Sequence, residues 1–311
     1  MAIPFLLSYC PLVRQALIIL KKTKFELDEE RYPDREFYAK ITSLQNNCYD
    51  RIYHSHLRQL ESRKILQEIF GPENCVFRDE FDRKNPADYE YLIALGGDNH
   101  FTYVAHHANG TKVIGCNSDV KTSRGVLLGF SPEMLRDAVE NNFQDTEVVE
   151  WAMIYGRLEY PEGTTLETVG CVNEISIRNM SPDLTSRYLI RYRDSQEEQK
   201  SSGLLLYTGA GSTGWYSSCL GLSGNEQQKF PKDAPYFGVF ARELSHRARL
   251  NFKLNDFIAN GSVTVVSEMN GGISIDSLPE RIYHFPPGTI GTFQLSSHKL
   301  KTVVPKQENS I

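Results

Sequence analysis

The stretch that decides the fold is YLIALGGDNHFTYVAHH, residues 91–107. Its first five residues form an apolar run typical of a buried strand, and the residues at 101–105 predict a helix. Gly96 and Gly97 lie between the two elements. Strands that alternate with helices indicate a parallel sheet covered by helices, in which ligands bind beyond the carboxyl ends of the strands. Asp98, directly after the glycines, is therefore predicted to face a ligand.

The same alternation extends over the N-terminal half of the chain. Apolar runs at residues 15–20, 75–77 and 112–117 predict further strands. Apolar residues at roughly helical spacing over about 36–70 predict a helix that ends at Gly71-Pro72. The basic residues at 21–24 are expected in a loop after the first strand. Together these elements predict an α/β domain.

The C-terminal half has a different pattern, which begins near Glu150. Short β-rich runs alternate there with turn-forming clusters of Pro, Gly, Ser and Asp. The expected strands are at residues 151–158, 168–177, 188–192, 203–208, 263–267 and 272–275. One helix is expected at about 235–250. This half is therefore predicted to be a mostly β domain.

Size and composition narrow the class of protein. A chain of 311 residues is long enough for two domains. The net charge of −5 gives no global attraction for nucleic acid or an anionic membrane, and no apolar run approaches the roughly 20 residues that span a bilayer. The six cysteines show no metal-ligand spacing. With no convincing signal or transit peptide, a cytoplasmic protein with reduced thiols is expected.

The Gly-Gly-Asp segment suggests phosphate chemistry. Glycines at the end of a strand let the backbone take positive φ and bring amide groups close to an anion. Asp98 then suits a base that accepts a proton from a hydroxyl attacking a phosphoryl group. The alternative interpretation is a simple strand-ending turn in which Asp98 caps its own helix.

A second glycine-rich loop, TGAGSTG at residues 208–214, follows an apolar run. Its glycines and hydroxyl residues suit polyphosphate binding, although the loop lacks the lysine of a P-loop. Trp215 and Tyr216 follow it and are candidates to stack on a base. The alternative is a flexible hairpin loop.

Asn173 and Glu174 lie inside an alternating strand pattern, GCVNEISIRN at 170–179. A carboxylate that points inward is costly unless it is paired, and a ribose diol would satisfy both side chains. The alternative is an outward-facing pair on a half-exposed strand.

In their order along the chain, the segments at 96–100, 173–174 and 208–215 resemble the marks of the ATP-dependent NAD kinase family: GGDGT, a central NE and a TPTGSTAYS-like loop. Three further segments, at residues 24–32, 114–119 and 200–204, resemble the mitochondrial-type branch. The similarity extends from about Gln15 to Val304.

The resemblance implies an NAD kinase, which transfers the γ-phosphoryl of ATP to the 2′-hydroxyl of the adenosine ribose of NAD. It implies an α/β domain at 1–145, joined by a C-terminal segment at about 286–311, and a β-rich NAD-binding domain at 146–285. Asp98 would be the catalytic base. The residues implied in NAD binding are Asp98, Asn173, Glu174, Thr213 and Trp215. Those implied in binding the phosphates of ATP are Gly96, Gly97, Asn99, Gly209, Gly211, Ser212 and Thr213. Mg²⁺ would arrive with ATP, and a homodimer or higher homo-oligomer is implied.

The chain departs from the family pattern where Asn99-His100 replaces Gly-Thr, and in the second loop at Ala210 and residues 214–216. His100 is expected either to contact phosphate when protonated or to cap the helix. Two alternatives follow for the function. One is a dinucleotide-binding regulatory protein with weak or no catalysis, and the other is a related kinase with a different acceptor, such as a lipid.

Overall fold

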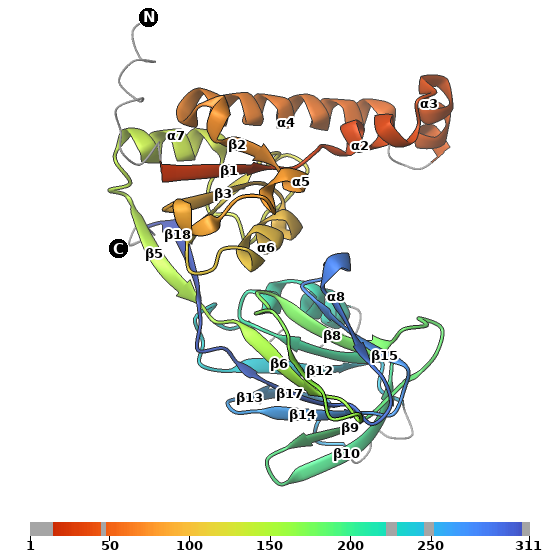
Figure 1. Ribbon diagram of the computed structural model, residues 1–311. Coiled ribbons are helices and arrows are strands. Elements are labelled where there is room, and N and C mark those ends of the chain that lie inside the picture. Colours follow the sequence, from red (N-terminus) through yellow and green to blue (C-terminus); the bar gives the residue numbers. More distant parts are fainter. Residues whose placement is uncertain (1–14, 45–47, 222–228, 246–251, 307–311) are drawn as a thin grey trace, which may run out of the picture. The chain divides into compact units, whose positions relative to one another are not determined.

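The computed structural model describes residues 15–44, 48–221, 229–245 and 252–306 (Figure 1). The chain forms two compact units. The first contains the residues up to Val149 and those from Lys301 onward, and the second contains Glu150–Leu300. The predicted fold class, an α/β domain with a parallel sheet and a mostly β domain, is confirmed. No helix within the described residues is long and apolar enough to span a membrane.

The first unit is built on a six-stranded sheet with the order β2-β1-β3-β4-β18-β5. Its strands are β1 (Ala16–Leu20), β2 (Cys75–Phe77), β3 (Tyr91–Gly96), β4 (Lys112–Asn117), β18 (Leu300–Pro305) and β5 (Thr146–Trp151). The pairs β1–β2, β1–β3, β3–β4 and β4–β18 are parallel. Every residue of β1 and β3 is buried, as expected of inner strands that are covered on both faces.

The helices of this unit are α2 (Lys24–Arg31), α3 (Arg35–Leu44), α4 (Tyr49–Phe70), α5 (Arg78–Phe81), α6 (Asp98–His106) and α7 (Pro132–Glu140), with short 3₁₀ turns at Pro72–Asn74 and Pro86–Asp88. α4, α5, α6 and α7 pack on the strands, whereas α2 and α3 pack on α4. α4 and α7 lie on one face, where Leu66, Ile69 and Leu135 share a core with Ile18 and Ile93 (Figure 1). α6 lies on the other face (Figure 1).

Two expectations for this unit change in detail. The helix expected over 36–70 is two helices, α3 and α4, and residues 45–47 between them lie outside the described part of the chain. The loop expected at 21–24 ends at Thr23, which caps α2. The Thr23 side chain accepts from the Glu26 N–H while the Glu26 side chain accepts from the Thr23 N–H. This reciprocal capping starts the helix at Lys24.

The second unit contains two antiparallel six-stranded sheets with the orders β10-β9-β14-β17-β6-β7 and β13-β12-β11-β8-β15-β16. Their strands are β6 (Ile154–Glu159), β7 (Thr165–Glu167), β8 (Glu174–Asn179), β9 (Ser186–Tyr192), β10 (Ser195–Ser201), β11 (Gly203–Tyr207), β12 (Phe237–Arg242), β13 (Asp256–Ala259), β14 (Val263–Ser267), β15 (Gly271–Ile275), β16 (Ile282–Phe285) and β17 (Ile290–Leu295). One core lies between them, to which β9 and β14 contribute Ile190 and Val265 and β8 and β11 contribute Ile177 and Leu206.

The helix predicted at about 235–250 is wrong, because residues 237–242 form strand β12. Phe237, Val239 and Ala241 join the core and alternate with Gly238, Phe240 and Arg242, a period of two that suits a strand. Residues 246–251 of that prediction lie outside the described part of the chain. A helix that was not predicted, α8 (Trp215–Gly221), follows the second glycine-rich loop.

The C-terminal segment expected to join the first unit from about residue 286 does so only from Lys301. The physical reason is that β17 (Ile290–Leu295) pairs with β14 and β6 inside the second unit. β18 then pairs with β4 in the first. The boundary expected at 145/146 falls at 149/150.

Candidate functional site

Asp98 is the first residue of α6, where the chain leaves β3. Its carboxylate does not cap its own helix; Gly97 is the N-cap residue, without a side-chain cap. Instead Oδ1 accepts from the Leu127 N–H at 2.9 Å and Oδ2 from the Val126 N–H at 3.2 Å. The side chain is half-buried. Each oxygen keeps a lone pair, so the carboxylate is oriented and still able to accept a proton.

The two glycines before Asp98 do not adopt the positive φ that the sequence analysis expected. Gly97 is extended, with φ −110° and ψ −176°. Gly96 is needed for packing, since a Cβ there would lie 2.9 Å from atoms of the His100 side chain. A Cβ on Gly97 would meet only Ser123 Oγ, at 3.7 Å. Gly97 is therefore the glycine of this pair that the protein itself does not require.

His100 takes neither of the roles expected for it. It is fully buried, and its Nε2 lies 2.9 Å from the Ile19 carbonyl oxygen, so Nε2 carries the hydrogen and donates it. Burial is the main cause that lowers the pKa of His100, to about 4. The ring is therefore neutral at pH 7 and contributes to the core rather than to a phosphate contact. The neighbouring Asn99 is exposed, and its predicted phosphate contact stays a prediction.

In the second unit, Glu174 begins β8 and is only 6% exposed. Burial, followed by the negative charge of Asp276, raises the pKa of Glu174 to about 7. Ser277 Oγ donates to Glu174 Oε1 at 3.1 Å. Beside it, Asn173 Oδ1 is buried and has no hydrogen-bond partner. A buried acceptor without a donor, next to a carboxyl whose hydrogen bond from Ser277 occupies only one of its oxygens, suits a ligand that brings hydroxyl groups.

Asp276 and Ser277 were missed by the sequence analysis, although they hold this site. Asp276 accepts from the N–H groups of Val172, Asn173 and Glu174 at 2.8, 2.6 and 3.1 Å. Both residues have positive φ, 51° and 55°, directly after β15. A polar Asp-Ser pair at the end of an apolar strand was the available signal, but its partners lie about a hundred positions earlier in the chain.

The loop at 208–214 is fastened to the same site. A Cβ on Gly211 would lie 2.0 Å from the Asn173 carbonyl oxygen, and a Cβ on Gly209 would lie 1.9 Å from the Pro231 carbonyl oxygen. Close backbone contacts therefore account for both glycines without any ligand. A Cβ on Gly214 would lie 3.6 Å from Glu174 Oε2, so the end of the loop borders the Glu174 carboxyl.

The hydroxyl groups of this loop are mostly used within it. Ser212 is buried and its Oγ donates to the Gly209 carbonyl at 2.7 Å. The Thr213 Oγ1 donates to the Ala210 carbonyl at 3.1 Å, and Thr213 is exposed. The loop is thus a tight 3₁₀ turn (Gly211–Thr213) rather than an open cradle, and its phosphate contacts stay predictions.

The two aromatic residues after the loop have different surroundings. Tyr216 is buried and stacks on Tyr207, with ring centroids 3.9 Å apart, so the base stacking considered for Tyr216 is wrong. Trp215 is half-buried, and the Arg242 guanidinium lies 4.6 Å from the centroid of its ring. Trp215 therefore remains the candidate for contact with NAD.

Comparisons with known proteins concern the sequence and the fold of the chain. No protein-family model matches the chain. Human mitochondrial NAD kinase 2 is 24% identical over 250 residues, covering 65% of this chain and 57% of the human protein. The rat protein is also 24% identical over 250 residues, with 65% and 59% covered. The chain therefore spans less than two thirds of the length of these curated relatives.

The structure matches a crystal structure of an NAD kinase from Archaeoglobus fulgidus in complex with ATP. The TM-score is 0.56 at 16% sequence identity, and the match covers 94% of each chain. The fold is thus NAD kinase-like. More particularly, the sequence is similar to mitochondrial NAD kinase 2.

Proposed function

We propose that the protein is an NAD kinase, which transfers the γ-phosphoryl group of ATP to the 2′-hydroxyl of the adenosine ribose of NAD and releases NADP and ADP. The similarity to mitochondrial NAD kinase 2 supports this reaction. The observation that carries it is the Asp98 carboxylate, which lies at the carboxyl edge of a parallel sheet and is oriented by the Val126 and Leu127 N–H groups. A carboxylate held in this way suits a general base.

In this proposal Asp98 accepts the proton of the attacking hydroxyl as the bond to phosphorus forms. Phosphoryl transfer has a loose transition state, so positioning and charge neutralisation provide most of the rate and the base a smaller part. A general base typically contributes about 10²- to 10⁴-fold. The donor is ATP with its Mg²⁺, which neutralises phosphate charge when bound.

Asn173 and Glu174 would bind the sugar of NAD. Asn173 Oδ1 is a buried acceptor that a ribose hydroxyl would satisfy. The Glu174 carboxyl, with a pKa of about 7, accepts a hydrogen bond when ionised and donates one when protonated. The Asp276 carboxylate accepts hydrogen bonds from the N–H groups of residues 172–174 and so fixes the backbone that carries both side chains.

The test is Asp98→Asn. NADP and ADP formation from ATP and NAD is measured for both proteins, and NAD affinity is measured separately by calorimetry. We expect turnover to fall about 10²- to 10⁴-fold while NAD affinity changes little, because the amide keeps the size of the carboxylate but accepts no proton. Equal turnover in the two proteins would refute the role of Asp98. NAD binding without ADP release in the unaltered protein would identify a dinucleotide-binding regulatory protein instead.

A further inference from the structure

A hollow of about 130 Å³ lies in the first unit, several times the roughly 30 Å³ that one water molecule occupies. It is bordered by the start of α2, the first turns of α4 and the loop after β4, and is lined by Lys24, Arg51, Ile52, Ser55, His56, Gln59 and Thr122. The segments at 24–32 and 114–119, which are far apart in sequence, both lie beside it: Lys24 lines the hollow, and Asp119 accepts from Ser55, which also lines it.

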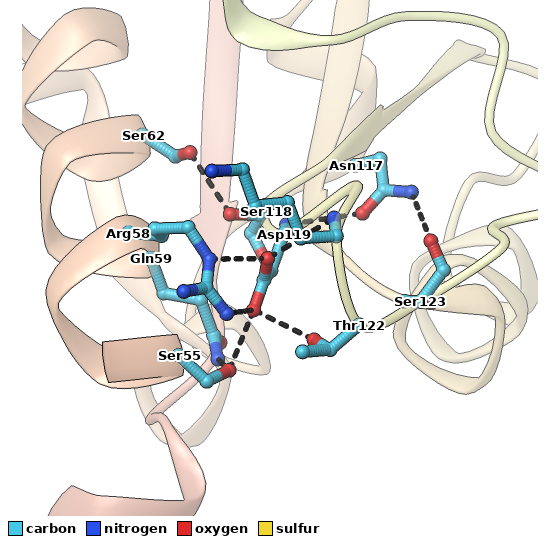
Figure 2. A network of polar contacts seen from close by, with 10 residues as sticks. Ser55, Arg58, Gln59, Ser62, Asn117, Ser118, Asp119, Thr122 and Ser123 are labelled. Carbon is cyan, nitrogen blue, oxygen red and sulfur yellow. Dashed lines mark hydrogen bonds and ion pairs between the residues drawn. The ribbon is translucent and has the colours of Figure 1, made fainter. Parts of the chain in front are cut away.

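One wall of the hollow is a polar network around Asp119 (Figure 2). The buried Asp119 carboxylate accepts from Arg58 Nε at 2.8 Å and Nη2 at 3.0 Å, and from the hydroxyls of Ser55 and Thr122, each at 2.6 Å. Burial acts to raise the pKa of Asp119, but the hydrogen bonds from Arg58, Ser55 and Thr122 outweigh it and hold that pKa at about 2. The carboxylate is thus ionised, and its charge is neutralised inside the wall.

Apart from Ile52, the side chains that line the hollow are polar or cationic, and there is no carboxylate among them. Arg51 is exposed and forms no ion pair with another residue of the described chain. The Lys24 ammonium has three donors, of which Asp28 Oδ2 engages one at 2.5 Å. Gln59 Nε2 donates to Ser55 Oγ at 3.1 Å and has a second hydrogen to offer. This donor set suits an anion with several oxygens.

The hollow and Asp98 are connected by one loop. Thr122 lines the hollow, and Ser123 Oγ is the atom nearest to the side-chain position of Gly97. Further along the same loop, the N–H groups of Val126 and Leu127 hold the Asp98 carboxylate. The β1, β3 and β4 strands are parallel, so the segments that follow them share the carboxyl edge of the sheet.

Asn117 fixes the conformation of this loop. Its Nδ2 donates to the Ser123 carbonyl at 3.0 Å, while its Oδ1 accepts from the Asp119 N–H at 3.0 Å (Figure 2). Ser62 Oγ also donates to the Ser118 carbonyl at 2.9 Å, which ties the loop to α4. The loop that contributes Thr122 to the hollow is therefore held in one conformation, which lowers the entropic cost of binding a ligand there.

We propose that this hollow binds phosphate groups of the nucleoside triphosphate donor, with Arg51 and Lys24 as the charged contacts. The proposal rests on the proposed kinase function, because it places the donor on the side of Asp98 where the loop at 118–127 begins. The part of the donor that would occupy the hollow is its polyphosphate chain, so inorganic triphosphate is the simplest probe.

The test uses Arg51→Gln, with Lys64→Gln as the matched control. Both residues are exposed cations on α4, and a separation of 13 positions puts them about 20 Å apart along the helix axis. Calorimetry at low salt measures the dissociation constants of inorganic triphosphate, ATP and NAD. We expect Arg51→Gln to weaken triphosphate and ATP binding about tenfold, Arg51→Lys to recover part of the loss, and Lys64→Gln and NAD binding to change less than about twofold.

The outcome distinguishes this proposal from the kinase function. If the protein forms NADP while Arg51→Gln leaves the triphosphate affinity and the KM for ATP unchanged, the hollow is not the donor site although the kinase assignment stands. If triphosphate binding depends on Arg51 but no NADP forms, the hollow binds phosphate and the kinase assignment fails. Absence of triphosphate binding to the unaltered protein also overturns the proposal.

Discussion

Replacing Glu174 by Gln is expected to change how the stability of the second unit depends on pH. The pKa of Glu174 is raised from 4.5 to about 7 in the folded protein, mainly by burial and then by the charge of Asp276. The folded state therefore binds this proton more tightly than the unfolded chain does. The stability that the protonated carboxyl contributes is present in full below pH about 4.5 and is lost as the pH rises through about 7.

The size of the effect follows from the shift. One pKa unit corresponds to about 1.4 kcal/mol, so the shift of Glu174 corresponds to about 3 kcal/mol between pH 4.5 and pH 8. A glutamine of nearly the same shape carries no charge at either pH and can still accept from Ser277 Oγ. As the pH rises over this range, the free energy of unfolding of the unaltered protein should therefore fall by about 2–3 kcal/mol relative to that of the variant.

The assay is urea unfolding followed by tryptophan fluorescence at several pH values. Of the two tryptophans of the chain, Trp215 lies in the second unit, and its signal reports on the unit that contains Glu174. Trp151 is the last residue of β5, at the boundary between the units in the sequence. Glu167→Gln, an exposed carboxyl of the same unit, is the control and should give a difference that is flat with pH. A difference between Glu174→Gln and the unaltered protein that does not change from pH 5 to pH 8 would refute the assignment of a raised pKa.

Two further predictions concern the glycines Gly211 and Gly97 and the buried carboxylate of Asp119. Gly211→Ala should lower the free energy of unfolding by about 1–3 kcal/mol, because the new Cβ would lie 2.0 Å from the Asn173 carbonyl oxygen. Gly97→Ala should leave the urea midpoint unchanged within experimental error, because the nearest atom to the new Cβ would be Ser123 Oγ, at 3.7 Å. Equal losses in the two alanine variants would contradict this argument. Asp119→Asn should lower the free energy of unfolding by about 2 kcal/mol at neutral pH. Hydrogen bonds from Arg58 and the neighbouring hydroxyls hold the pKa of Asp119 at about 2, against the effect of burial. The ionised carboxylate therefore contributes stability that is present in full above pH about 3.8 and is lost as the pH falls through about 2. A loss from Asp119→Asn that stays constant down to pH 2 would show that the carboxylate charge is not its source.

The sequence was sufficient for elements whose signal is local. The strands at 91–95 and 112–117 are continuous apolar runs, and the structure places them next to each other in a parallel sheet. The start of α2 was not predicted, although Thr23 and Glu26 have the spacing of a capping box. The expected helix at 235–250 failed because the alternation of Phe237, Val239 and Ala241 is a weak signal over a short segment.

The candidate sites depended on contacts that no local pattern contains. Asp276 holds the N–H groups of residues 172–174 from about a hundred positions away, and this contact positions the Asn173–Glu174 pair. The glycines indicated that the backbone comes close to another group, but not which group. Gly209 and Gly211 were expected to make room for phosphate, and the structure shows that they make room for carbonyl groups of the chain itself. A glycine marks a close approach, but the sequence does not say what approaches.

The departure at Asn99-His100 also has a structural reason that bears on catalysis. His100 fills the interior beside Gly96 and donates to the Ile19 carbonyl in β1, so its imidazole faces the core and not the ligand side of α6. The ligand side of α6 therefore gains no charge from His100. Asn99 is the exposed residue at this turn, and its amide is neutral. The cations that a triphosphate needs must then come from elsewhere at the carboxyl edge of this sheet, and Arg51 and Lys24 are charged groups beside the loop that orients Asp98.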